Sequence, residues 1–517
     1  MTLKRSFYKG FESVVGAQNI SEEPAILDSY AWRSGMFAGM VKFMPRFETV
    51  ILPQDTEEVQ AIVKLCNRYK IKFKACSTGW GGSNSPGGAG AIQLDLRRMN
   101  RIIEINEENM YAVVEPHVIG AQLQAELMKR GLNFTGNGAG SQTSALPLAA
   151  GTGHGFMSQT TGLGERNVLA VEWVTPEGEI IRLGSLGASG EWFCGDGPGP
   201  SLRSALRGAA SSAGGIGVFT KAATKVYHWP GPSTFPVKGI SPNYVPSRTP
   251  ENFLVRFFTF PSSTKMVEAA RRIGESEIAF QLSHSISMLT SSMATCNEED
   301  IELLERFRKL AQGPGFIVTL AGNSPREFEY KKAVLQDIID ETNGESLKPI
   351  EDAQIQGAIL WRFIRMTTAI REAHRATGVW FGNMAGHNYA AIEAKYSQTA
   401  ARLKDEMIKK GLVFDGDRGL LDLMLWPQEH GHRGLAEIVI RYFPNPETMK
   451  ALEHLREECY KVALNEHLGG PYGVSGDKLH DRFGPHYSNY HVWLRKFKKA
   501  FDSNGVGEST NYITADE

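Results

Sequence analysis

Residues 75–84 read Ala-Cys-Ser-Thr-Gly-Trp-Gly-Gly-Ser-Asn, and Ser-Pro-Gly-Gly follows at 85–88. The stretch comes directly after Lys70–Lys74, where basic and apolar residues alternate as they do in a strand. Glycines at 79, 81 and 82 let the backbone approach a ligand closely. A row of free backbone N–H groups in such a turn binds anions. An ordinary glycine-rich surface loop has the same composition, so the rest of the chain has to decide between the two interpretations.

Length and composition indicate a globular protein with more than one domain. At 517 residues the chain is too long for a single core, so we expect two or three domains. Its 42% hydrophobic and 22% charged residues are typical of a globular chain. The formal net charge of −1 gives no excess of cations for attracting phosphates, which argues against a nucleic-acid-binding protein.

The cysteines and the N-terminal residues bear on the compartment. Five cysteines are scattered along the chain without a Cys-x-x-Cys pair. This pattern predicts reduced thiols, and it excludes an iron–sulfur cluster or zinc knuckle held by this chain alone. Residues 1–16 lack the apolar core of a signal peptide, and no run reaches the length of a membrane span. We therefore expect a cytoplasmic protein, at most peripheral to a membrane, with no transmembrane segment.

Alternating strands and helices are predicted before residue 136. The clearest helix is Thr56–Arg68, which begins with a capping threonine and two acidic residues and continues with an apolar stripe. The expected strands are 49–52, 71–74, 92–96, 102–105 and 111–115, and a second helix covers 120–130. Two further runs of small residues follow at 136–164 and 208–217, with strands at 168–175, 179–183 and 223–227.

Prolines at 230, 232, 236 and 242 predict a domain boundary near 230–245. Beyond it we expect a separate α+β domain. Its expected strands are 253–260, 278–282, 316–320 and 435–442, and its helices 264–273, 299–311, 325–341, 361–376, 390–410 and 446–465. Residues 469–490 are expected to form a loop, and 492–501 a last helix.

Three glycine-rich segments separated by strands favour one kind of anionic ligand. A mononucleotide usually needs one loop at a helix N-terminus. The P-loop pattern Gly-x-x-x-x-Gly-Lys-Ser/Thr and a Rossmann Gly-x-Gly-x-x-Gly that opens a helix are both absent. Three segments spread over roughly 140 residues suit a long dinucleotide that lies across a domain.

From Arg46 to Trp229 the chain resembles the FAD-binding domain of the vanillyl-alcohol oxidase/p-cresol methylhydroxylase (PCMH-type) superfamily. The similarity is strongest to the branch with D-lactate dehydrogenases, the glycolate oxidase flavin subunit and alkyl-dihydroxyacetone-phosphate synthase. The segments that carry it are 77–84 with 92–101, the Val-Val-Glu-Pro-His-Val turn at 113–118, 164–169 with Pro-Glu-Gly-Glu at 176–179, 214–221, and 500–506. Trp80 stands where some relatives place a histidine that bonds the flavin, and no histidine precedes His117.

The resemblance implies an α+β fold and FAD as the cofactor. The expected domains are a PCMH-type FAD-binding domain of two α/β subdomains at 1–235, a substrate or cap domain at 236–470, and a C-terminal tail at 471–517 that returns to the FAD domain. The residues expected to contact FAD are Ser77, Thr78, Gly79, Trp80, Gly81, Gly82, Ser83, Asn84, Ser141, Thr143, Ser144, Ala149, Gly151, Thr152, Gly153, Gly155, Gly217 and Val218. Peptide dipoles rather than lysines would then neutralise the phosphates.

The C-terminal half is expected to set the substrate. The D-2-hydroxy-acid branch holds a divalent metal with histidines, and His430 and His432 lie where the first pair belongs. Residues 473–478 stand in place of the later Gly-Glu-His-Gly turn of that branch. A plain polar loop is the alternative interpretation for both segments. We therefore predict no metal, and name His430 and His432 as the candidate ligands if one is bound. A flavin dehydrogenase also needs a base and a cation for its substrate. The candidates for catalytic roles are His387, His432, Arg441, Tyr472 and Lys478, with Arg362 as a further cation.

We expect hydride transfer from the hydroxyl-bearing carbon of a 2-hydroxy acid or alcohol to FAD. The alternatives are oxidation of para-substituted phenols or aromatic alcohols, a reaction on FAD without net redox turnover, and a flavin subunit of a larger electron-transfer complex. Since the chain has no set of cysteines that could bind an iron–sulfur cluster, the electrons would be transferred from FAD to a separate acceptor such as an iron–sulfur subunit. A homo- or hetero-oligomer is expected.

Overall fold

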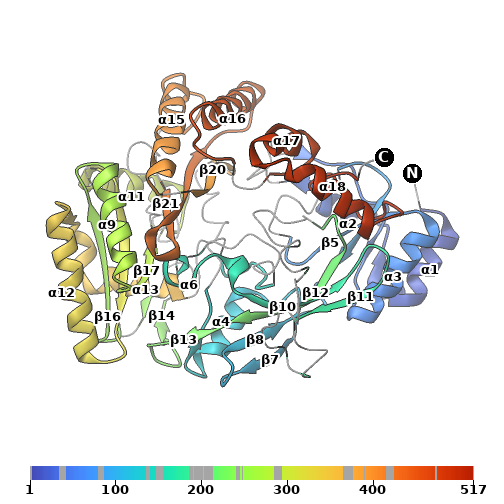
Figure 1. The fold of residues 1–517 in the computed structure, drawn as a ribbon, viewed down its shortest axis with the longest axis horizontal. Coiled ribbons are helices and arrows are strands. Elements are labelled where there is room, and N and C mark those ends of the chain that lie inside the picture. The colour runs from blue at the N-terminus through green and yellow to red at the C-terminus, as the bar shows by residue number, and fades with distance from the viewer. Residues whose placement is uncertain are drawn as a thin grey trace.

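The computed structural model places an N-terminal lobe beside a cap lobe, which lie to the right and left in Figure 1. It describes residues 3–33, 42–79, 87–135, 140–146, 155, 157–184, 190, 192, 202, 206, 214–239, 245–246, 249–283, 294–311, 313–364, 377–388, 390–414, 424–471 and 474–515. The N-terminal lobe contains residues up to 228 together with the last helices, and the cap lobe contains residues 249–468.

The N-terminal lobe is built on two sheets. The first has the order β1-β4-β6-β5, with β4, β6 and β5 parallel, and the second the antiparallel order β11-β10-β12-β8-β7. The strands are β1 (Ile20–Ser21), β4 (Val50–Ile51), β5 (Lys72–Cys76), β6 (Ala91–Asp95), β7 (Ile102–Asn106), β8 (Tyr111–Val114), β10 (Val168–Val174), β11 (Ile180–Leu183) and β12 (Val218–Lys225). Short pairs are β2 (Trp32–Arg33) with β3 (Lys42–Phe43) and β9 (Leu132–Asn133) with β13 (Tyr227–His228).

Helices bury one apolar stripe each against these sheets. The helices of this lobe are α1 (Arg5–Val15), α2 (Pro24–Ala31), α3 (Thr56–Tyr69), α4 (Gly120–Met128), α6 (Ser158–Thr161), α17 (Asp477–Phe483) and α18 (Tyr490–Phe501), with short 3-10 turns η1 (Ala17–Asn19), η2 (Gly164–Arg166) and η6 (Gly484–Tyr487). α1 and α3 share a core with the first sheet, and α4 shares one with the second. The expected α+β class with two α/β subdomains is confirmed.

One buried carboxylate connects the two subdomains. Glu172 on β10 is 1% exposed and accepts hydrogen bonds from Thr56 of α3 at 2.7 Å and from Lys221 of β12 at 2.5 Å. Burial would raise the pKa of Glu172, but the hydrogen bonds from Lys221 and Thr56 outweigh it and lower this pKa to about 2. The carboxylate therefore stays charged and holds α3 against the second sheet.

The cap lobe has two antiparallel sheets of the orders β17-β18-β16-β19 and β20-β22-β21. Its strands are β16 (Phe253–Thr259), β17 (Ala279–Ser283), β18 (Gly315–Ala321), β19 (Glu345–Ser346), β20 (Trp380–Asn388), β21 (Met424–Gln428) and β22 (Arg433–Arg441), after the small pair β14 (Val237–Lys238) and β15 (Val245–Pro246). The helices are α9 (Ser263–Glu275), α11 (Asn297–Leu310), α12 (Pro325–Glu341), α13 (Ala353–Ile364), α15 (Ala390–Lys409) and α16 (Pro446–Asn465), with η3 (Lys348–Glu351) and η5 (Glu429–Gly431).

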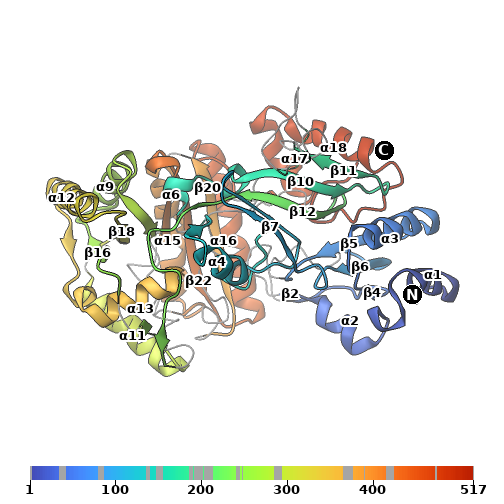
Figure 2. The ribbon, with the colours of Figure 1, turned by 90° about the horizontal axis from the view of Figure 1, so that it is seen from below.

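The four-stranded cap sheet is covered on both faces. α9 and α12 bury one face, while α11 and α13 share the other core with Met128 and Trp229 from the N-terminal lobe. Figure 2 shows α9 and α12 on the outer side of this sheet. The proline-rich connection is therefore anchored in the cap core by Trp229, whose ring lies 5.6 Å from that of Phe253.

Some individual elements differ from the expectations. The helix predicted from residue 361 begins earlier, at Ala353 in α13, where Asp352 accepts backbone hydrogen bonds from Gln354 and Ile355, and residues 365–376 of the prediction lie outside the described residues. The predicted loop 469–490 contains α17, which buries His480 and Phe483, three residues apart, on one face. β20 was not predicted, because its glycines and asparagines are typical of loops and its pairing with β22 decides the conformation.

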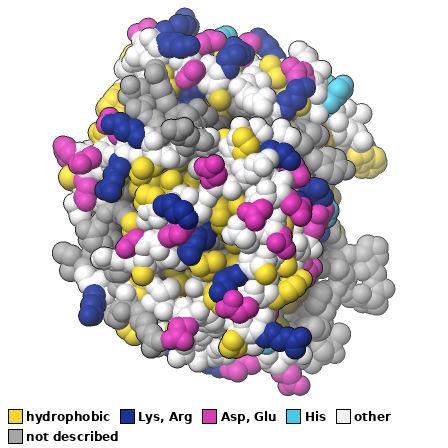
Figure 3. Space-filling view, turned by 90° about the vertical axis from the view of Figure 1, so that its left-hand side faces the viewer, with side chains coloured by type: hydrophobic (Ala, Val, Ile, Leu, Met, Phe, Trp, Pro, Cys, Tyr) yellow, Lys and Arg dark blue, Asp and Glu magenta, His cyan; other side chains and the backbone are white. Residues whose placement is uncertain are grey.

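The face shown in Figure 3 mixes basic and acidic side chains around apolar ones, in agreement with the net charge near zero. Among the helices that the structure describes, none is both long enough and apolar enough to cross a membrane.

Glu172→Gln should lower the unfolding free energy at pH 7 by about 3 kcal/mol, since the pKa falls from 4.5 in the unfolded chain to about 2 in the folded protein. A depressed pKa gives stability that is complete above pH 4.5 and is lost as the pH falls toward 2. Urea unfolding across this range should therefore show a shallower acid dependence for the variant.

The exposed pair Lys129–Glu126 provides the control, and Glu126→Gln should change the unfolding free energy by less than about 0.5 kcal/mol. An unchanged acid dependence in Glu172→Gln would contradict the account of this carboxylate.

Candidate cofactor and substrate site

The first glycine loop begins at the carboxyl end of β5. Ser77 and Thr78 are half-buried, and Gly79 has a φ of 72° with no atom within 4 Å of its Cβ position. The backbone here faces open space, as a cradle for an anionic group requires. The expected contacts Trp80, Gly81, Gly82, Ser83 and Asn84 lie outside the described residues.

The C-terminal tail holds both sides of this loop. Phe73 donates its backbone N–H to Val506 at 2.8 Å, and Glu508 donates its own to Phe73 at 3.0 Å, so the tail extends the edge of the first sheet. Beyond the loop, Gly87 fits so closely against Thr510 that a Cβ at this position would overlap the threonine side chain. The described residues on the two sides of the loop therefore contact a segment more than 400 residues away in the chain.

Two buried ion pairs fix the tail in turn. Lys74 on β5 lies 2.7 Å from Glu508, and the two side chains are 1% and 5% exposed. Burial would raise the pKa of Glu508, but the charge and hydrogen bond of Lys74 lower it. Lys498 of α18 contacts Asp502 and the carbonyl oxygens of Gly215 and Gly507. These contacts hold Gly215, near the end of the third glycine-rich run, against the tail, and the Cβ position of Gly214 lies 3.8 Å from the side chain of Lys74.

Gly217 in the third run is fixed by two constraints. Its φ is 106°, and a Cβ there would overlap the carbonyl oxygen of Val174 and lie 2.9 Å from Nε1 of Trp173. Trp173 is fully buried and donates a hydrogen bond to Ile216 at 2.7 Å. Val218 pairs with Val174 in the second sheet and is buried. The described end of the run, Gly214–Gly217, therefore leads into the central strand β12 with its main chain close to the core.

The second run uses its hydroxyl groups to fold itself. Thr143 donates its hydroxyl to the carbonyl of Gly140 at 2.7 Å, and Ser144 donates its hydroxyl to Pro116. Ser141 accepts a backbone hydrogen bond from Ala121 at 3.0 Å. These bonds hold the turn against the start of α4. The backbone groups of the turn that take no part in them are the ones left for a ligand.

The rest of the second run is described only in part. Gly155 is buried and donates its N–H to the hydroxyl of Ser158 at 2.7 Å. Ala149, Gly151, Thr152 and Gly153 lie outside the described residues.

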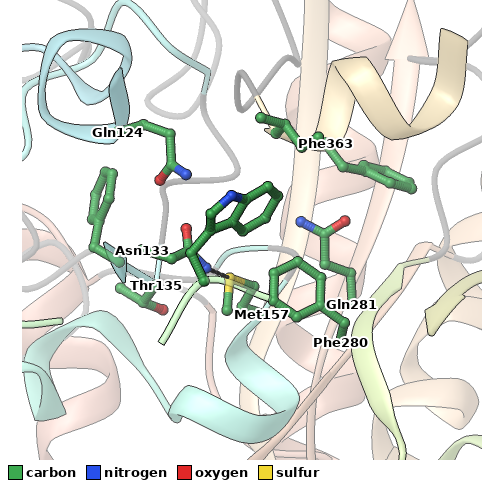
Figure 4. Close-up of a pocket in the computed structure, with 10 residues that line it drawn as sticks. Gln124, Asn133, Thr135, Met157, Phe280, Gln281 and Phe363 are labelled. Carbon is green, nitrogen blue, oxygen red and sulfur yellow. Dashed lines mark hydrogen bonds between the residues drawn. The ribbon is translucent and has the colours of Figure 1, made fainter. Parts of the chain in front are cut away.

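A pocket lies where the second run meets the cap lobe (Figure 4). Its lining residues are Gln124, Asn133, Phe134, Thr135, Met157, Trp229, Phe280, Gln281, Phe363 and Ile364. Met157 lies two residues after Gly155, so the pocket adjoins one of the segments expected to line the cofactor, 149–155. Phe280 and Gln281 on β17 and Phe363 on α13 close it from the cap side.

The polar side chains of the pocket are held by the protein. The side-chain amide of Asn133 donates a hydrogen bond to the sulfur of Met157 at 3.0 Å, which Figure 4 shows as a dashed line. The hydroxyl groups of Thr135 and Thr161 form a hydrogen bond of 2.6 Å. Gln124 and Gln281 are 4% and 5% exposed. The ten described lining residues include no charged side chain. The space between these aromatic walls and amides has room for about one water molecule.

The predicted catalytic residues do not line this pocket. Arg441 is 1% exposed at the end of β22, Lys478 is exposed on α17, and His432 is exposed after η5. The side chain of His387, whose backbone belongs to β20, and the whole of Tyr472 lie outside the described residues. The roles proposed for these five residues stay predictions.

Among the charged candidates, Arg362 is the one that is adjacent in sequence to a residue of the pocket wall. It is 4% exposed on α13 and directly precedes Phe363 of the pocket wall. Its role as a cation for the substrate also stays a prediction.

The turn that carries His430 joins the two lobes. Glu429 lies 3.1 Å from Arg166 and accepts the backbone N–H of Leu163 at 3.2 Å. On its other side the turn contacts α9 so closely that a Cβ on Gly274 would overlap the carbonyl of His430. His430 itself is 44% exposed, 3.6 Å from Glu277.

The candidate metal ligands His430 and His432 therefore lie at the turn that joins the two lobes. In the part of the chain that the structure describes, no group of three or more His, Cys, Asp and Glu side chains could hold a metal ion. A metal bound by His430 and His432 would need a further ligand outside these residues.

Sequence reasoning did not find the amides of the pocket. Gln124 lies in the apolar stripe of α4, between Leu123 and Leu127, and Gln281 lies within a strand of otherwise apolar residues. A polar residue on a face predicted to be buried is the one signal that could have identified them.

Residues 47–184 match the FAD binding domain family. A probable mitochondrial D-lactate dehydrogenase from Danio rerio is 25% identical over 358 residues, which cover 68% of this chain and 63% of that protein. The flavoprotein subunit of 4-cresol dehydrogenase from Pseudomonas putida is 33% identical over 143 residues, 26% of each chain. The chain thus matches less than two thirds of the length of these relatives.

Two solved structures share the fold over nearly the whole chain. A p-cresol methylhydroxylase with substrate bound has a TM-score of 0.73 at 17% identity, covering 98% of this chain and 96% of that one. A 4-ethylphenol oxidase from Gulosibacter chungangensis has a TM-score of 0.71 at 18% identity, covering 98% and 97%. At these identities the likeness shows the fold alone.

Gly217→Ala should lower the unfolding free energy by about 3 kcal/mol or more and abolish retention of FAD, because the methyl group would displace Val174 or Trp173. Urea unfolding and the flavin-to-protein absorbance ratio measure the two effects.

Gly88→Ala is the matched control, since no atom lies within 4 Å of its Cβ position and its φ is not positive. We expect wild-type stability and flavin content for the control. Wild-type flavin content in Gly217→Ala would refute a role for this backbone in holding the cofactor.

Proposed function

We propose that this chain is an FAD-dependent oxidoreductase of the PCMH type that takes a hydride from the hydroxyl-bearing carbon of a small alcohol or 2-hydroxy acid. One observation carries the proposal. The pocket between the lobes adjoins the stretch 149–155, which is expected to line the cofactor, so a substrate group that reaches it would lie next to the flavin. FAD supplies the hydride acceptor when it is bound.

The residues of this chain fit such a cofactor. Gly79 has a positive φ and open space at its Cβ position, and Gly217, directly before β12, has a positive φ and packs its main chain against Val174 and Trp173. These positions would hold the pyrophosphate and the remainder of the dinucleotide through backbone N–H groups. The residues 77–84, 141–144, 149–155 and 217–218 stay our proposal for the FAD contacts.

The pocket residues would position the substrate and exclude water. Trp229, Phe280 and Phe363 provide apolar walls, which keep a reacting carbon in a dry environment. The amides of Gln124 and Gln281 would orient a substrate hydroxyl by hydrogen bonds. A base for the hydroxyl proton is not among the ten described lining residues, and His387 is our candidate on the neighbouring cap sheet.

Oxidation of a para-substituted phenol or an aromatic alcohol is a second candidate. The aromatic walls and the lack of charge among the described lining residues favour an aromatic ring over a small anion. A 2-hydroxy acid would need a cation such as Arg362. For either substrate, electrons would leave to a separate acceptor, and one relative is named as a flavoprotein subunit.

The test is the absorption spectrum of the purified protein, recorded anaerobically before and after addition of benzyl alcohol, D-lactate or 4-methylphenol. The proposal expects flavin bands that bleach with benzyl alcohol or D-lactate. Bleaching by 4-methylphenol alone would select the phenol branch.

Spectra of the reoxidised enzyme, with oxygen or with an added electron carrier, would identify the class of acceptor. A colourless protein that cannot be reconstituted with FAD would contradict the proposal.

A further inference from the structure

Glu508, in the C-terminal tail, uses both of its carboxylate oxygens. One of them, Oε2, lies 2.7 Å from Nζ of Lys74 on β5, three residues before the first glycine loop begins at Ser77. The other, Oε1, accepts a hydrogen bond from the backbone N–H of Thr510 at 3.1 Å and another from the hydroxyl of the same threonine. Glu508 is 4% exposed, so these bonds are made away from bulk water.

Thr510 carries this contact to the other side of the loop. Its side chain lies against Gly87, where a Cβ would overlap the oxygen and the methyl group of the threonine. Because the hydroxyl of Thr510 is bonded to Glu508, the position of the threonine side chain depends on that carboxylate. A chain of contacts therefore runs from one side of the loop to the other. We call its members, Lys74, Glu508, Thr510 and Gly87, the loop clamp.

The clamp lies on the polar face of the first sheet. Phe73 and Leu94, on adjacent strands, belong to the apolar core shared with α1 and α3. Since side chains alternate along a strand, Lys74 and its neighbour Gln93 on β6 point to the opposite face. The Cβ position of Gly214, in the third glycine-rich run, lies 3.8 Å from the side chain of Lys74. The clamp is thus built between two of the segments that are expected to hold FAD.

The tail does not depend on Glu508 alone for its place. Tyr512 accepts the backbone N–H of Gly476 at 3.0 Å. Arg495 donates to the carbonyl of Thr514, also at 3.0 Å. Removal of the carboxylate at 508 would therefore leave the tail attached and change the connection between the two sides of the loop.

The opposite charges of the clamp separate its role from simple attraction of an anion. Glu508 neutralises Lys74 beside the loop that is expected to bind phosphate. Loss of the carboxylate alone would add net positive charge there, which attracts anions more strongly. If the clamp positions the backbone, the same change weakens anion binding instead, because a loop whose ends can shift loses preorganisation.

We propose that Glu508 is a positioning residue for the cofactor. It fixes residues 77–79 and Gly87 relative to each other, so that the backbone N–H groups of the loop can bind the pyrophosphate of FAD, and it does not itself contact the cofactor. The inference rests on the proposed FAD contacts and is independent of the substrate.

The test is calorimetric titration of the full-length protein, purified without flavin, with ADP and with adenosine. ADP shares the adenosine and pyrophosphate of FAD, so comparison with adenosine isolates the phosphate contribution. Wild type should bind ADP at least about tenfold more tightly than adenosine. Glutamine has one acceptor oxygen and can serve Lys74 or Thr510 but not both, so Glu508→Gln should weaken ADP binding about tenfold and change adenosine binding less than about twofold.

Thr510→Val tests the clamp without changing any charge, and it decides the matter if Glu508→Gln does not fold. Valine keeps the shape against Gly87 but cannot bond to Glu508 through its side chain. ADP affinity should fall by about threefold or more while adenosine affinity stays the same. Glu107→Gln, in an exposed ion pair with Arg130 of the same lobe, is the matched control and should change neither affinity.

Tighter or unchanged ADP binding in Glu508→Gln would overturn the proposal, and so would unchanged ADP binding in Thr510→Val. Equal losses for ADP and adenosine would also overturn it, because a general loss of structure affects both ligands alike. Equal affinity of the wild type for ADP and adenosine would contradict the proposed phosphate site itself. The proposed reaction is tested by bleaching of the flavin, so it can fail without changing these results.

Discussion

The buried ion pair between Lys74 and Glu508 is the interaction on which the arrangement of the N-terminal lobe depends. Neither charge could stay buried without the other, since an unpaired charge in a protein interior is strongly unfavourable. The pair fixes the C-terminal tail along β5, and Lys498 then connects the tail to Gly215. The first and third glycine-rich segments thus lie side by side although they are far apart in the sequence.

The cap lobe is held against this platform by contacts of two kinds. Trp229 and Met128 are part of the cap core, and Glu429 connects the cap to Leu163 and Arg166 of the N-terminal lobe. Apolar burial supplies most of the favourable free energy and the ion pair sets the register. The pocket between the lobes therefore has walls that both lobes keep in place.

The sequence predicted elements whose signals are local. α3, α12 and α16 were predicted to within one residue, because each follows a capping side chain that accepts a backbone hydrogen bond and continues with an apolar stripe. The predicted cap of α3 was wrong: Asp55 caps this helix, and the hydroxyl of Thr56 donates to Glu172 instead. The FAD-binding family was predicted from short motifs, and the match over residues 47–184 confirms it.

Features that depend on distant contacts could not be predicted in this way. β20 contains residues typical of loops, and only its pairing with β22 makes it a strand. The amides of Gln124 and Gln281 become pocket residues only when the lobes meet. Candidates chosen by residue type, such as Arg441 and Lys478, lie in the cap core and on an exposed helix face, because chemistry alone does not place a side chain.

A crystal structure of the protein with FAD bound tests the central claim most directly. The account predicts the pyrophosphate at the loop that begins with Ser77 and the flavin ring beside the stretches 141–144 and 149–155, with its reactive edge toward the pocket at Met157. A flavin ring bound elsewhere, with the pocket separated from it by protein, would contradict the account.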